Sequence, residues 1–231
     1  MAQISVAEAA ARLGISPRRV RERIAEGSLH AQALGNQWSI DEASLHRVSG
    51  RAGRPLSYRA AWAILAYSMG DGSPDDKAEA LRILDLLELS PSEHSLARKR
   101  LRSLRSAQDV EEMLRPWLVN RAERRVYRAS PRDLDDLRDD PDLLLSGLSH
   151  PESGMAVSDL VEGYVSVDSL EDLVDRYLLV DGPDRRSNVV LHIARRRPNV
   201  ASPLLLAADL AEHHGPRESG RSRELVQVAR W

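Results

Sequence analysis

The chain of 231 residues contains no cysteine and no phenylalanine, and lysine occurs only at Lys77 and Lys99. The absence of cysteine excludes disulfide bonds and cysteine-based zinc sites. No apolar run approaches the roughly 20 residues that a membrane-spanning helix needs. The first residues also lack the basic and then apolar pattern of a secretory signal. We therefore expect a cytoplasmic protein without a membrane partner.

The sequence also lacks the motifs of several large enzyme classes. The glycine-rich phosphate-binding motifs and the H-E-x-x-H zinc motif are missing, as is the G-x-S-x-G nucleophile elbow. Six aspartates lie between residues 133 and 142, but without the central glycine and terminal glutamate of a calcium loop. We therefore expect no enzymatic activity, no cofactor and no bound metal.

Charge is distributed unevenly, although the net charge is only −2. Residues 1–60 hold nine arginines and five acidic residues, whereas residues 129–181 hold fourteen acidic and three basic residues. Local fields steer association more than the net charge does. The nearly neutral total therefore does not argue against DNA binding. We expect the acidic block 129–181 to face away from DNA or towards a basic partner.

Two short helices joined by a turn are predicted near the N-terminus. Ser5 and Glu8 have the spacing of a capping box, and Gly14 ends the first helix. Ser16 is a suitable cap for a second helix with Pro17 at its first position. The apolar residues that fall on the inner faces of the two helices are Val6, Ala10, Leu13, Val20 and Ile24.

A β-hairpin and a third helix are expected to follow. Residues 29–34 alternate in polarity, Gly35-Asn36 forms a two-residue turn, and residues 37–40 return. Asp41 then caps a helix that carries Ala43, Leu45 and Val48. The order of helix, turn, arginine-rich helix, hairpin and helix resembles the excisionase and MerR-type DNA-binding domains. The segments that carry this resemblance are residues 6–10, 13–16, 17–18, 20–21 and 27–29, with residues 38–40 closing the wing.

This resemblance implies a winged helix-turn-helix whose second helix enters the major groove of double-stranded DNA. The residues expected to contact DNA are Arg18, Arg19, Arg21 and Glu22 on that helix, Asn36 in the wing, and Arg51 and Arg54 after the domain. Gly53-Arg54-Pro55 resembles the core of an AT-hook, in which an extended arginine enters the minor groove. A plain linker is the alternative for this stretch.

Beyond the hinge we expect further helices and then a mixture of helices and strands. The fold class is therefore mainly α with an α+β C-terminal domain, preceded by the winged helix-turn-helix. We assign residues 1–49 to the DNA-binding domain, 50–58 to a hinge, 59–128 to a helical middle region and 129–231 to an α+β partner-binding or sensor domain. Short strands are predicted at residues 124–128, 143–145, 160–165 and 188–194.

One helix of the middle region carries a basic stripe. Arg98, Arg102 and Arg105 fall on one side of it, with Leu96 and Leu104 expected on the opposite side. Such a stripe either follows DNA phosphates or is a solvated face.

The region after the hinge resembles the long antitoxin-like regulators of the type IV abortive-infection E class. The segments that carry this resemblance are residues 53–57, 59–63, 89–93, 98–102, 126–129, 145–147, 161–165, 187–191, 208–212 and 216–218. The resemblance implies a protein that neutralises a nucleotidyltransferase-like toxin and represses its own operon.

The sequence thus predicts a dimeric, DNA-binding transcriptional regulator, an autorepressing antitoxin of a type IV toxin–antitoxin system. Its expected partners are double-stranded DNA, a nucleotidyltransferase-like toxin and a second copy of the chain. One alternative is a recombination directionality factor that acts with an integrase. Another is a scaffold whose helix-turn-helix binds protein.

Overall fold

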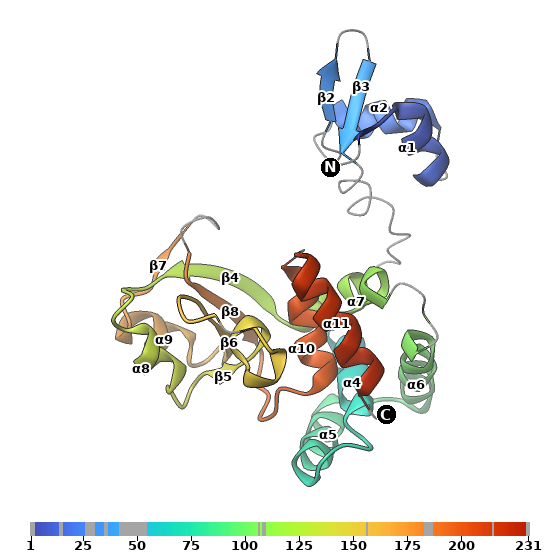
Figure 1. Cartoon of the computed structure of the whole chain (residues 1–231). Helices are drawn as coiled ribbons and strands as arrows, with labels where there is room; N and C mark the ends of the chain where they lie inside the picture. The colour runs from blue at the N-terminus through green and yellow to red at the C-terminus, as the bar shows by residue number, and fades with distance from the viewer. Residues whose placement is uncertain are drawn as a thin grey trace. The chain divides into compact units, whose positions relative to one another are not determined.

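In the computed structural model the chain divides into two compact units, Met1–Gly53 and Arg54–Trp231 (Figure 1). The structure describes residues 3–13, 16–25, 31–34, 37–41, 55–105, 107, 110–155, 157–182, 187–213 and 215–229. Within these ranges every helix is too short or too polar to cross a membrane. Each unit has its own core and is described separately.

The first unit combines two helices with a small antiparallel sheet. Its elements are β1 (Gln3–Ile4), α1 (Val6–Leu13), α2 (Pro17–Ala25), β2 (Ala31–Leu34) and β3 (Gln37–Asp41). The strand order is β1-β3-β2, so the central strand β3 pairs with both neighbours. The predicted hairpin turn at Gly35-Asn36 and the predicted helix after Asp41 lie outside the described residues.

The caps predicted for the two N-terminal helices are confirmed. Ser5 Oγ accepts a hydrogen bond from the Glu8 amide at 3.2 Å, and Glu8 Oε2 accepts one from the Ser5 amide at 2.8 Å. Ser16 Oγ accepts from the Arg19 amide at 3.2 Å. Because these bonds satisfy amides that a helix leaves unpaired at its start, they fix where α1 and α2 begin.

The core of the first unit lies between the inner faces of the helices and the sheet. Its buried residues are Ile4, Val6, Ala9, Ala10, Val20 and Ile40, and Ile24 and Ala31 pack against them partly buried. The predicted inner residues Val6, Ala10 and Val20 are therefore confirmed. The side chain of Leu13 lies outside the described part of the chain.

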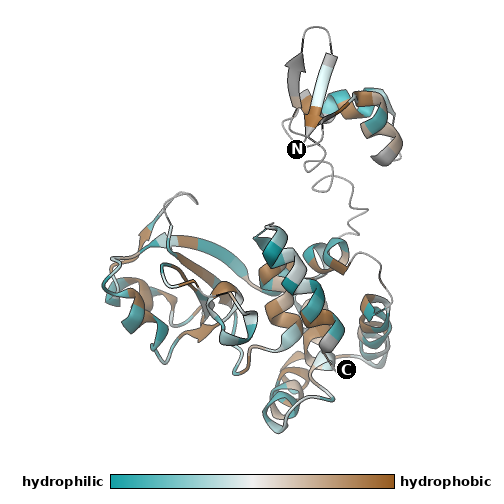
Figure 2. Ribbon diagram, in the orientation of Figure 1, coloured by the Kyte–Doolittle hydropathy of each residue, from teal (hydrophilic) through white to brown (hydrophobic). Residues whose placement is uncertain are grey.

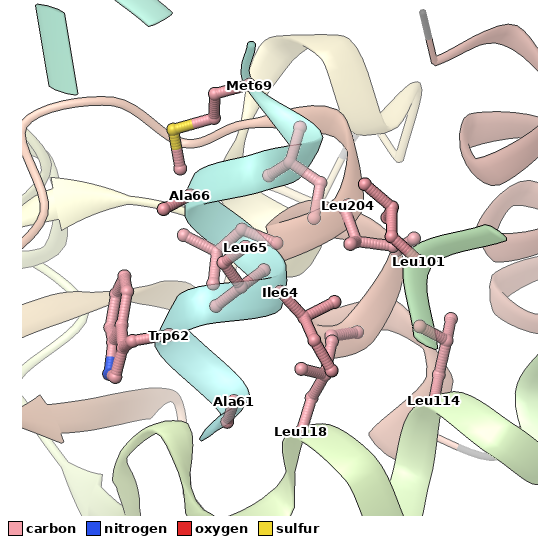
Figure 3. Packing of buried hydrophobic residues seen from close by; sticks show 14 of the residues in the cluster. Ala61, Trp62, Ile64, Leu65, Ala66, Met69, Leu101, Leu114, Leu118 and Leu204 are labelled. Atoms are coloured by element: carbon pink, nitrogen blue, oxygen red, sulfur yellow. The ribbon is translucent and has the colours of Figure 1, made fainter. Parts of the chain in front are cut away.

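The second unit contains a group of helices and a mixed sheet. The helices that build the larger core are α4 (Tyr58–Ser68), α5 (Pro74–Leu87), α6 (Pro91–Arg105), α7 (Val110–Leu118), α10 (Pro203–Glu212) and α11 (Pro216–Val228). Residues 61–66 of α4 are all buried, and its neighbours surround it (Figure 3). Helix α10 is likewise buried along most of its length and is largely hydrophobic (Figure 2). A helix that is apolar on all sides has to lie inside the protein.

Helix α5 begins at Pro74. Ser73 Oγ accepts from the Asp76 amide at 3.1 Å, and Asp76 Oδ2 accepts from the Ser73 amide at 2.9 Å. This capping box, with proline at the first helical position, fixes where the helix starts.

The mixed sheet has the strand order β5-β6-β8-β4-β7, and only the neighbours β6 and β8 run parallel. Its strands are β4 (Glu123–Arg128), β5 (Leu144–Leu145), β6 (Val161–Ser166), β7 (Val180–Asp181) and β8 (Val189–Ala194). The four predicted strands are confirmed within two residues, and β7 is additional. The short helices of this region are η1 (Val119–Arg121), α8 (Leu134–Arg138), η2 (Gly147–Ser149), η3 (Pro151–Ser153) and α9 (Leu170–Arg176).

The two faces of the sheet differ in chemistry because side chains alternate along a strand. Val161 and Val165 of β6, with the odd-numbered residues of β8, pack against α8 and α9 in a second apolar core. Glu162 and Tyr164 of β6 and His192 of β8 belong to the opposite, polar face and are also buried. This polar face is where the sheet meets the α10 side of the unit.

Segments from both halves of the second unit share the larger core. Helix α10 packs against α7 and α4, and α11 packs against α7. The predicted boundary between residues 128 and 129 therefore falls inside one compact unit. The reason is that α10 is buried along most of its length and packs against helices of the preceding region.

Candidate functional site

Helix α2 presents a row of arginines on the surface of the first unit. Arg18, Arg19 and Arg21 are exposed, whereas Val20 between them is completely buried. Val20 and Ile24 hold the helix against the core, so the arginines have to point outwards. The side chain of Arg18, in the first turn, is 88% exposed.

Glu22 pairs with two of these arginines. Its Oε1 lies 3.1 Å from Arg18 Nε, and its Oε2 lies 3.0 Å from Arg19 Nη1. The hydrogen bonds from Arg19 and then Arg18 lower the pKa of Glu22 below its usual value, so the carboxylate is charged at neutral pH. Glu22 thus holds two guanidinium groups side by side and competes with any other anion for them.

Four further residues are predicted to contact DNA, and the structure describes Arg21 among them. The side chain of Arg21 makes no hydrogen bond or ion pair with a described residue. It lies one turn from Arg18, so the two side chains occupy neighbouring positions on the helix surface. Asn36, Arg51 and Arg54 lie outside the described residues. The structure therefore brings Arg18, Arg19, Arg21 and Glu22 together on one helix.

The predicted basic stripe on α6 is exposed, but its opposite side was partly misassigned. Arg98, Arg102 and Arg105 lie at the surface, and Arg98 lies 4.7 Å from the centre of the Tyr67 ring. The expectation that Leu96 faces the interior is wrong, because this side chain is 44% exposed. Ala97, Leu101 and Leu104 form the buried side, since the neighbours of α6 approach it from that direction.

A buried polar network in the second unit was missed by the sequence analysis. The Arg121 guanidinium contacts Asp209 Oδ1 from Nη2 at 2.5 Å and Glu212 Oε1 from Nη1 at 2.7 Å. Its Nε donates to the Tyr164 hydroxyl oxygen at 2.7 Å. Ser146 Oγ also donates to Asp209. These contacts pair a buried cation with carboxylates and satisfy most of its donors.

Glu162 forms the second half of this network. Its carboxylate accepts hydrogen bonds from His192 Nε2 and His213 Nε2, both at 2.9 Å, and from the Leu148 amide at 2.7 Å. Burial alone raises the pKa of Glu162, but the bonds from the two histidines outweigh it and lower this pKa to about 2. Burial lowers the pKa of His213, but the bond to Glu162 outweighs it and raises that pKa above the usual value.

Gly147 allows the loop before η2 to approach this carboxylate. Its φ is 51°, in the left-handed region, and a Cβ at this position would overlap the Glu162 carboxylate. Within the described ranges, no group of three histidine, aspartate or glutamate side chains is arranged to hold a metal ion. The hydrogen bonds and ion pairs of Arg121, Glu162 and Asp209 join β6, β8, η1, η2 and α10.

One sequence signal for this network was present. Asp209 interrupts the apolar stretch of residues 204–211, and a charge inside such a stretch is rarely left without a partner. Arg121, the partner, lies 88 positions away, so the pairing itself could not be read from local spacing.

The comparison with protein families agrees with the geometry of the first unit. The family model of the helix-turn-helix domain matches residues 4–48. No curated protein and no solved structure matches the chain. The predicted helix-turn-helix is thus confirmed, whereas the resemblance of the later residues to abortive-infection antitoxins stays a prediction.

Proposed function

We propose that this chain is a transcriptional regulator that binds double-stranded DNA through the helix-turn-helix of its first unit. The observation that carries the proposal is the exposed row of Arg18, Arg19 and Arg21 on α2, within the residues that match the helix-turn-helix family. The second helix of such a domain lies in the major groove, and its N-terminal residues meet the base edges.

The arginines of α2 have the chemistry that this role needs. A guanidinium can donate two parallel hydrogen bonds to guanine O6 and N7, or bind a backbone phosphate. Arg18 and Arg19 belong to the first turn of α2, so we assign them to base edges. Arg21 lies one turn further on, and we assign it to a phosphate. Glu22 has to release or share its two arginines when DNA binds.

The antiparallel pair β2–β3 acts as the wing in this proposal. Ala33 pairs with Trp38 in its register, and the Trp38 side chain is partly exposed. Wings of this kind lie over the DNA backbone beside the recognition helix. Two copies of the chain would place two recognition helices about 34–36 Å apart, one turn of the duplex, on a palindromic operator. Autorepression and toxin neutralisation rest on the sequence resemblance alone.

Genome-wide capture of fragmented DNA by the full-length protein tests this proposal. We expect one enriched sequence motif, which the variant Arg18→Ala loses. Arg132→Ala is the matched control, because Arg132 is an exposed arginine of the second unit, and it should leave the motif unchanged. Enrichment that is identical in Arg18→Ala, or the absence of any retained DNA, would contradict the proposal. A motif confined to an integrase attachment site would instead identify a recombination directionality factor.

A further inference from the structure

We propose that a pocket in the second unit is a binding site for a small organic anion with an aromatic body. The pocket lies between the start of α4, the second half of α5 and the residues that follow β8, and its volume is about 260 Å³. This proposal concerns the second unit alone and does not depend on DNA binding by the first.

The charged residues that line the pocket are arginines. Arg59, Arg82, Arg195 and Arg196 line it, and none of the described residues that line it is acidic. Arg195 and Arg196 are exposed and form no ion pair with a described residue. Two guanidinium groups are therefore available to an anion at the mouth of the pocket.

The other two arginines are already held in place by neighbouring carboxylates. Arg82 donates to both oxygens of Glu79, at 2.7 and 2.6 Å. Arg59 lies 3.5 Å from Glu93 and donates to the Glu88 carbonyl at 3.3 Å. These carboxylates orient the two guanidinium groups and offset much of their charge, so we assign the anionic group of a ligand to Arg195 and Arg196.

The other residues that line the pocket are apolar or aromatic. The rings of Tyr58 and Trp62 are 6.1 Å apart, and Ile83 and Leu87 of α5 are buried beside them. Trp62 Nε1 donates to the Arg121 carbonyl at 2.8 Å, which fixes the orientation of the indole. Helix α4 with Trp62 is shown in Figure 3.

Tyr58 lies next to one of the arginines that form no ion pair with a described residue. The Arg195 guanidinium lies 4.7 Å from the centre of the Tyr58 ring, a distance at which a cation and an aromatic face attract each other. A ligand with an anionic group and a flat apolar body would therefore place the anion at Arg195 and Arg196 and its ring beside Tyr58. A site that contacted only DNA phosphates would not need apolar and aromatic residues beside its arginines.

The size of the pocket limits the ligand. Pockets for drug-sized molecules range from about 300 to 1,000 Å³, so a cavity of about 260 Å³ suits one or two fused rings with a single carboxylate, sulfonate or phosphate. We choose 2-naphthoate as the probe, because it combines a planar apolar body with one carboxylate. Its neutral counterpart, 2-naphthamide, has nearly the same shape and lacks the charge.

Calorimetric titration of the full-length protein with both probes tests the proposal. We expect 2-naphthoate to bind with one-to-one stoichiometry and 2-naphthamide to bind at least about tenfold more weakly, the usual effect of losing a hydrogen bond to a charged group. Arg195→Gln should weaken binding of the acid by about the same factor, and Arg132→Gln should leave it unchanged.

A second pair of variants tests the position of the site without touching an arginine. Leu86 lies at the rim of the pocket and is 45% exposed, whereas Leu81 on the same helix is 70% exposed and does not line it. Leu86→Glu should weaken binding of 2-naphthoate by charge repulsion, and Leu81→Glu should not. Equal binding of the acid and the amide, equal effects of the two glutamates, or no binding of either probe at millimolar concentration would overturn the proposal. Loss of DNA affinity in Arg195→Gln without probe binding would also overturn it and identify a nucleic-acid contact instead.

Discussion

Arg121 and Asp209 meet inside the second unit at 2.5 Å, and both side chains are almost completely buried. They come from η1 and α10, two segments that lie 88 residues apart in the sequence. The pair therefore ties the start of the sheet region to a helix near the end of the chain. Burying a charge without a partner costs free energy. Loss of one member of this pair is therefore expected to destabilise the second unit.

Asp209→Ala should lower the free energy of unfolding by about 3–5 kcal/mol, since it leaves the buried Arg121 without its closest counter-charge. The measurement is urea unfolding of the second unit, followed by tryptophan fluorescence. Asp135→Ala is the control. The Asp135 side chain pairs with Arg138 and is 93% exposed, and ion pairs of exposed carboxylates contribute little to the free energy of unfolding. Similar losses of unfolding free energy in the two variants would show that the buried pair stabilises the protein no more than the exposed one.

The network around Glu162 predicts a pH optimum of stability. The folded-state pKa of Glu162 is about 2, below its ordinary value of 4.5. Its contribution is therefore present above pH 4.5 and is lost as the pH falls towards 2. The pKa of His213 is raised above 6.5. Its contribution is therefore present below pH 6.5 and is lost as the pH rises through the raised value.

The second unit should accordingly be most stable between about pH 4.5 and 6.5. Urea unfolding across pH 3–9 measures this dependence. Glu162→Gln should flatten the acid side of the profile, and His213→Gln should flatten the alkaline side. If both variants show the same pH dependence of stability as the wild type, Glu162 and His213 do not have these roles.

Arg18→Ala should weaken binding to the operator by about 1–3 kcal/mol, the usual contribution of a good contact between a side chain and a base. Binding to unrelated DNA should change much less, because a base contact carries sequence information. Fluorescence anisotropy with labelled operator and with a scrambled duplex separates the two effects. An unchanged operator affinity would remove Arg18 from the recognition surface.

Glu22→Gln should strengthen binding to all DNA sequences, by up to about fivefold, which is the range of exposed ion pairs. The carboxylate pairs with Arg18 and Arg19 in the free protein and repels phosphate, so its removal takes away one competitor for both guanidinium groups. Affinity measured at several salt concentrations should show the largest gain at low salt. If the variant instead loses operator affinity and keeps its affinity for scrambled DNA, Glu22 reads a base.

Arg54→Ala tests the predicted minor-groove contact of the hinge. If Arg54 binds DNA, the plot of log affinity against log salt concentration should become shallower by about one unit, as expected for one lost phosphate-type contact. Arg59→Ala is a nearby comparison, since Arg59 contacts Glu88 and Glu93 within the second unit. The same slope in wild type and Arg54→Ala would make this stretch a linker.

Local signals in the sequence were sufficient for the starts of α1 and α2 and for most strands. The caps at Ser5 and Ser16 depend on residues three positions apart, and a short run of mostly apolar residues marks β8, so neither requires knowledge of the fold. The exposure of the arginines on α2 follows in the same way, from the apolar positions of Val20 and Ile24.

What the sequence could not provide depends on contacts between distant segments. The buried direction of α6 is set by the helices around it, which is why Leu96 was assigned to the wrong side. The network of Arg121, Glu162 and Asp209 joins residues whose spacing follows no period. The pocket beside Tyr58 likewise requires α4, α5 and the end of β8 to meet.

The alternation along β6 and β8 also restricts how the parallel strands can pair during folding. Tyr164 pairs with His192, and their rings stack with centroids 4.9 Å apart. A slip of one residue would turn Glu162 or His192 towards the apolar core under α8 and α9, because a shift by one position exchanges the two faces of a strand. A slipped sheet would then hold an unpaired charge in a hydrophobic interior. The polar face thus acts against folding intermediates in which these strands are shifted by one residue, because it makes such a pairing much less stable than the native one.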